Sequence, residues 1–137
     1  MHNCTQKLDI DLSHFDDVFE QYITESMDEL PDQYIDHLEN VAIVIEDRPS
    51  PEQRKRLSLS CNSLLFGLYE GIPLTVKGTG NNMMLPPDKI TLFKEAILAV
   101  SRDKKELKAK IKRTLWHEIA HYYGLDHDRM HKLEAGL

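Results

Sequence analysis

Four residues in the stretch from His117 to His127 have the types and the spacing of a metal site. The stretch follows the pattern HExxHxxGxxH. Residues four apart lie on one face of a helix, so His117 and His121 can direct two imidazole nitrogens at one zinc ion. Glu118 lies about 100° further round the helix, beside such an ion rather than on it. Its carboxylate can take a proton from a zinc-activated water and pass it to a leaving group, so we expect Glu118 to be the catalytic residue.

A catalytic zinc site normally has three protein ligands and leaves a fourth position for water. Gly124 allows the chain to leave the helix sharply, and His127 follows three residues later. Only one glutamate, Glu134, follows His121 before the sequence ends, so a glutamate ligand far downstream is not expected. We therefore predict His127 as the third ligand. The alternatives, as replacement or assisting groups, are Asp126, Asp128 and His131.

Two other interpretations of these histidines remain open. A structural zinc site would close its shell with four protein ligands and would leave Glu118 without a role. The histidines could also be ordinary surface and core residues of a terminal helix. Neither interpretation gives Glu118 a catalytic role. Substitution of Glu118 therefore distinguishes both of them from a catalytic site.

The site is expected on a long helix that begins after Asp103 and ends at Gly124. Asp103 and Glu106 have the spacing of a capping box, and glycine suits the left-handed residue that ends many helices. The side predicted to be buried carries apolar residues at helical spacing. These residues are Leu107, Ile111, Leu115 and Ile119.

The rest of the chain predicts an α+β fold, a compact domain with a small mixed sheet of about three strands. Ser13 and Asp16 resemble a capping box for the first helix. The strand predicted at 89–93 is expected to be an exposed edge strand that can pair with an extended peptide. Strands are expected at 41–45, 64–70 and 89–93, and helices at 13–30, 32–38, 52–59, 93–100 and 127–134.

Length and composition predict one globular domain over residues 1–137, with residues 1–12 flexible or extended. A net charge of -6 does not favour binding to nucleic acid or to an anionic membrane, since both bind clustered positive charge. The basic stretch from Arg102 to Arg113 is interpreted as the solvated face of a helix. Only two cysteines, Cys4 and Cys61, and no signal peptide or long apolar run favour a cytoplasmic protein.

The stretch from His117 to His127 resembles the metzincin zinc signature, and residues 15 to 130 resemble the small bacterial minimal zincin family of predicted metallopeptidases. The resemblance implies a zincin-like fold, a peptide or protein substrate and Zn²⁺ held by His117 and His121, with Glu118 as the base. That family commonly has aspartate at the position of His127. Metzincins also carry a methionine turn beneath the zinc, and Met130 lies too close to His127 for that role. The matching stretches are 28–31, 40–47, 65–74, 85–93 and 114–121.

The runner-up function comes from a different class. The three histidines, with Gly124 and Asp126, also resemble the site of bacterial rRNA-maturation endoribonucleases. Those enzymes typically have glycine after the first histidine, where this chain has Glu118. A non-catalytic zinc-binding module is the third hypothesis. We expect a zinc-dependent metallopeptidase, and the sequence gives no oligomeric state.

Overall fold

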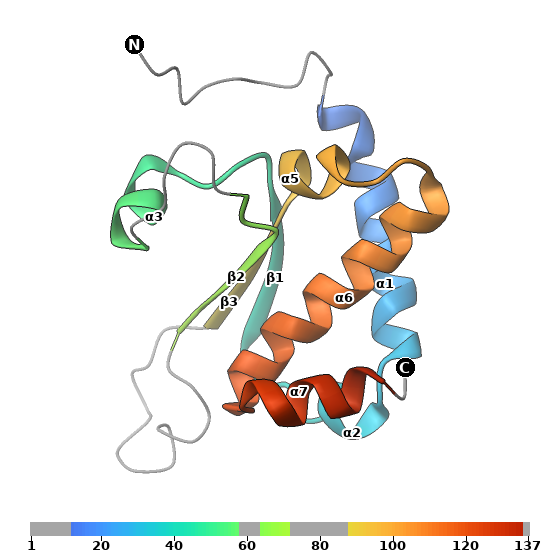
Figure 1. The fold of residues 1–137 in the computed structure, drawn as a ribbon, viewed down its shortest axis with the longest axis vertical. Helices are drawn as coiled ribbons and strands as arrows, with labels where there is room; N and C mark the ends of the chain where they lie inside the picture. The colour runs from blue at the N-terminus through green and yellow to red at the C-terminus, as the bar shows by residue number, and fades with distance from the viewer. Residues whose placement is uncertain (1–11, 58–63, 72–87, 136–137) are drawn as a thin grey trace.

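The structure, a computed structural model, describes residues 12–57, 64–71 and 88–135. A three-stranded sheet carries helices α1 and α6 on one side and helix α3 on the other (Figure 1). This arrangement is the α+β fold that the sequence predicts. The strands are β1 (Val41–Glu46), β2 (Gly67–Glu70) and β3 (Asp88–Phe93). The helices are the 3-10 helix η1 (Leu12–Phe15), α1 (Asp16–Glu29), α2 (Asp32–Ile35), α3 (Pro51–Arg56), α5 (Lys94–Ala99), α6 (Lys104–Tyr123) and α7 (His127–Glu134).

The strand order is β1-β3-β2, with β1 parallel and β2 antiparallel to β3. The prediction of an edge strand at 89–93 was therefore wrong, because β3 is the central strand and its backbone pairs on both sides. Five of its six residues are buried, as expected for a strand covered on both faces. Among the described strands, the one at the edge nearest α6 is β2.

Helix α6 forms where the sequence predicts it. The Asp103 carboxylate accepts a hydrogen bond from the backbone N–H of Glu106 at 2.9 Å, which caps the helix. The reciprocal capping bond does not form, because the Glu106 carboxylate accepts from the backbone N–H of Arg102 instead. Gly124 ends the helix in the left-handed conformation, with φ 71°. The four residues predicted to be buried on this helix are all buried.

The core lies between α6, α1 and the sheet. Trp116 is fully buried, and its ring meets the Tyr34 ring edge to face at a centroid distance of 5.1 Å. Phe19 of α1, Ile111 of α6 and Leu92 of β3 form a second cluster further along α6. Apolar packing along its length thus fixes α6, and with it the direction of any side chain on its polar face.

The capping box predicted at Ser13 and Asp16 was wrong. The chain begins with η1, and Phe15 is the cap residue of α1 without a side-chain hydrogen bond. Asp16 forms an ion pair with the buried Lys94, which also lies 2.9 Å from Asp47. A buried ammonium group needs carboxylate partners, so Asp16 is engaged by tertiary structure rather than by the helix start.

Several elements are shorter than expected. The strand predicted at 64–70 is regular only over Gly67–Glu70, and the helix predicted at 52–59 spans Pro51–Arg56. Sequence reasoning missed a complete capping box between Ser50 and Gln53 at the start of α3, although serine followed three residues later by glutamine is its usual signal. Both cysteines and the N-terminal segment 1–11 lie outside the described residues.

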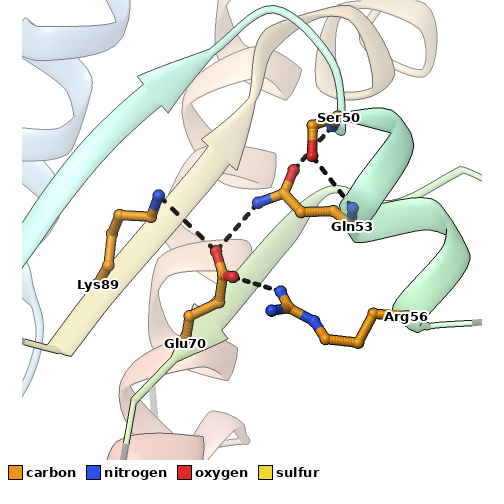
Figure 2. A network of polar contacts seen from close by, with 5 residues as sticks. All are labelled: Ser50, Gln53, Arg56, Glu70 and Lys89. Atoms are coloured by element: carbon orange, nitrogen blue, oxygen red, sulfur yellow. Dashed lines mark hydrogen bonds and ion pairs between the residues drawn. The ribbon is translucent and has the colours of Figure 1, made fainter.

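Helix α3 is tied to the sheet through one carboxylate (Figure 2). Glu70 of β2 accepts a hydrogen bond from the Gln53 side chain at 3.0 Å and forms an ion pair with Arg56. Lys89 of β3 lies 3.8 Å from the same carboxylate. Burial raises the pKa of Glu70, but the hydrogen bonds from Arg56 and Gln53 and the charge of Lys89 outweigh burial and leave the pKa lowered.

We expect Glu70→Gln to lower the free energy of unfolding by about 0.5–1 kcal/mol at neutral pH, since the ion pairs are partly exposed. A carboxyl with a lowered folded-state pKa stabilises the fold above its unfolded pKa of about 4.3 and loses that contribution as pH falls through the folded value. The difference between wild type and variant should therefore shrink in acid. Urea unfolding across this pH range measures it, with Glu52→Gln on the exposed side of α3 as control. An equal loss in the control would assign the effect to surface charge in general.

Candidate metal centre and active site

His117 and His121 meet at the last two turns of α6. Their Nε2 atoms lie 3.1 Å apart, and the ring centroids lie 4.8 Å apart. Two nitrogens bound to one tetrahedral zinc at about 2.0–2.1 Å would be separated by about 3.3 Å. The pair is therefore already spaced for a shared metal ion. Imidazole nitrogens are donors that zinc prefers, so the chemistry of the pair also fits.

Glu118 lies next to the two histidines but on the buried side of the helix, with 7% of its surface exposed. The ligand atoms of His117, Glu118 and His121 all lie within 4.8 Å of one another, the one such group among the described side chains. Burial raises the pKa of Glu118 to about 7, against a smaller lowering effect of a backbone hydrogen bond from Tyr69. A dication on the histidines would favour the carboxylate form. As a carboxylate beside the histidine pair, the group is placed to accept a proton from a molecule bound there.

Gly67, the first residue of β2, determines how closely the strand approaches the site. A Cβ atom at this position would lie 2.7 Å from Thr114 Cγ2 and 3.2 Å from Glu118 Cγ. Only glycine lets the edge strand come this near to α6. Sequence reasoning missed this residue, although a glycine inside a predicted strand can mark a close backbone approach.

A cavity of about 540 Å³ opens beside His117 and Glu118. Residues 64–67 form one wall, α6 forms the second, and α7 supplies the third. A larger cavity of about 840 Å³ lies along β1 and Lys94, but it contains neither histidine of the pair. Of these two cavities, the smaller one is lined by residues of the candidate site.

The residues considered for the third ligand are at or near the start of α7, which folds back across the end of α6 (Figure 1). His127 is the first residue of α7, and its side chain lies outside the described part of the structure. The Asp126 carboxylate caps α7 by accepting from the Arg129 backbone at 2.8 Å, and Asp128 is exposed. His131 lines the cavity, with its Nδ1 3.6 Å from the Glu134 carboxylate.

Comparison with known proteins identifies the family. A family model described as "Zincin-like metallopeptidase" matches residues 38–137, which include the strands, α6 and α7. The chain belongs to this family. The zincin-like fold that the sequence predicts is thereby confirmed, with the histidine pair and Glu118 on one helix. Within the described residues of this zincin-like protein, no helix has the length and apolar character needed to cross a membrane.

Other comparisons add little to the family assignment. One solved structure that matches the zincin-like chain is a conserved hypothetical protein from Thermo thermophilus, with 18% identity and a TM-score of 0.49. The match covers 79% of this chain and 92% of that one. A likeness of this degree supports no conclusion about activity. A search of curated proteins finds no match.

Proposed function

We propose that this protein is a zinc-dependent metallopeptidase that hydrolyses peptide bonds, with His117, His121 and His127 as ligands and Glu118 as general base. The observation that supports this most directly is the pair of imidazole nitrogens 3.1 Å apart beside a buried carboxylate. Membership of the zincin-like metallopeptidase family agrees with it. A structural zinc site would not need a carboxylate buried in this position.

The chain's own residues supply the proton transfers of the proposed reaction. Zinc, when bound, supplies Lewis acidity that lowers the pKa of a water molecule and polarises the scissile carbonyl. Glu118 takes the proton of the attacking water and later gives it to the leaving amine. The Glu118 carboxylate accepts a backbone hydrogen bond from Tyr69, and Glu118 is buried where β2 approaches α6 closely at Gly67.

His127 is proposed as the third ligand because it opens α7 directly after the turn that Gly124 makes out of α6. Asp126 is engaged in capping α7, which leaves it less suited to the metal. His131 lines the same cavity, one turn further along α7, and is the residue against which His127 has to be tested.

The test compares a peptide library with folded RNA as substrates of the zinc-loaded protein, with metal content measured by mass spectrometry on the same preparation. We expect one zinc per chain, cleavage of peptides, and loss of both in His121→Ala. His127→Ala should weaken zinc binding at least about tenfold, the lower end of the effect of losing even an outer-shell partner, and His131→Ala should not. RNA cleavage would favour the endoribonuclease. Bound zinc without any cleavage would favour a non-catalytic module.

A further inference from the structure

The cavity beside His117 is lined by two cations of α6 and by the carboxylates of Glu118 and Glu134. Lys110 and Arg113 of α6 both line it, and neither lies within 4.0 Å of an acidic oxygen in the part of the chain that the structure describes. The ammonium group of Lys110 instead lies 3.8 Å from the centroid of the Phe66 ring. The lysines on another face of the same helix behave differently. Lys108 and Lys112 lie 3.2 Å and 3.8 Å from Glu29 of α1.

This arrangement is unfavourable for the isolated protein. Burial lowers the pKa of Lys110, and the charge of Arg113 lowers it further, so the two cations are close enough to repel each other. The two cations repel each other in a chain that is acidic as a whole, with 23 acidic and 17 basic residues. Of the two carboxylates that line the cavity, Glu134 lies 3.6 Å from His131, and Glu118 is buried beside the histidine pair. An anionic group entering the cavity would relieve the repulsion and replace the lost hydration.

The spacing of the cations relates them to the reacting bond. Arg113 and Lys110 precede His117 by four and seven residues, which is about 6 Å and 10 Å along a helix. An extended peptide advances about 3.3 Å per residue. A peptide that lies along residues 64–67 with its scissile bond at His117 would therefore bring a side chain two or three residues away to these cations. Leu64, whose surface is 56% exposed, offers an apolar contact on the same wall.

We propose that Lys110 and Arg113 form a specificity subsite for an acidic side chain of an extended peptide substrate, two or three residues from the scissile bond. This inference rests on the proposed peptidase function for the position of the bond. The cations act on substrate selection only. They precede the histidine pair along α6 and take no part in the proton transfers.

Binding tests the subsite without turnover. The zinc-loaded Glu118→Gln protein is titrated into a fluorescent glutamate-rich peptide and into its twin with glutamine at the same positions. We expect the acidic peptide to bind about tenfold more tightly, the effect of one charge-assisted hydrogen bond. The double variant Lys110→Gln/Arg113→Gln should abolish the preference. Lys104→Gln/Lys105→Gln, the same loss of two charges on an exposed part of α6, should keep it.

Cleavage of a peptide library by the wild type provides the second measurement. Cut sites should be enriched in aspartate and glutamate two or three residues from the bond, and Arg113→Glu should shift that enrichment to lysine and arginine. Cleavage without a preference for acidic residues would contradict the proposed subsite but would still support the peptidase function. Charge-selective peptide binding without any cleavage would overturn the peptidase and support selection of an acidic peptide. An oligoribonucleotide that binds more tightly than the acidic peptide, through the same two cations, would overturn the peptide as ligand.

Discussion

Glu118→Gln is expected to lower kcat/KM for peptide cleavage by about 10²–10⁴-fold, the usual contribution of a general acid–base residue. Glutamine has nearly the same shape but cannot accept the proton of the attacking water. The variant should stay folded, because its neutral amide is no harder to bury than a carboxylate whose pKa is raised to about 7 by burial. Zinc content should also persist, since both imidazoles of the pair are unchanged.

The measurement is steady-state kinetics on zinc-loaded protein, with metal content and thermal unfolding on the same samples. Glu106→Gln serves as control, because it makes the same change at the opposite end of α6. Peptide cleavage at wild-type rate in Glu118→Gln would remove the general-base role. RNA cleavage that survives the substitution would replace the peptidase with the endoribonuclease.

Gly67→Ala is expected to lower peptidase activity by about 10²-fold, the effect of a displacement near 1 Å at a reacting group. The added methyl group would lie 2.7 Å from Thr114 Cγ2 and 3.2 Å from Glu118 Cγ, so β2 and α6 must separate or Glu118 must turn. The overpacking should also cost about 1–3 kcal/mol of the free energy of unfolding. Zinc content should be unaffected, because neither imidazole is among the nearest groups that the methyl would meet.

A compensating substitution makes this prediction specific. Thr114→Ser removes the methyl group that an alanine at position 67 would strike first. Added to Gly67→Ala, it should restore part of both activity and stability, while Thr114→Ser alone should stay near wild type. Equal losses in the single and double variants would show that the contact between β2 and α6 is not what limits residue 67. Double-mutant cycles of activity and urea unfolding give the coupling between the two positions.

The features that the sequence predicts well are local ones. The span of α6 follows from Asp103, from apolar residues at helical spacing and from Gly124, all of which act within a few residues of one another. The HExxH pair follows for the same reason, since a regular helix determines the relation between positions four apart.

The features that it predicts poorly depend on which segments meet in space. The central position of β3 depends on pairing with β1 and β2, which come from elsewhere in the chain. No local pattern in 89–93 predicts this pairing. Asp16 has the spacing of a capping residue, but the distant Lys94 engages it. The basic stretch 102–113 was interpreted as one solvated face. Folding divides it between ion pairs with α1 and the wall of a cavity.

Trp116 gives the protein a built-in optical probe. It is the only tryptophan of the chain, it directly precedes His117, and it is fully buried against Tyr34. Its indole N–H has no hydrogen-bond partner among the described residues, and the ring belongs to a buried cluster with Leu30, Ile90 and Leu115. All tryptophan emission therefore originates one residue from the histidine pair, in an environment that favours short wavelengths. A red shift on unfolding would report the loss of the very turn of α6 that holds the site.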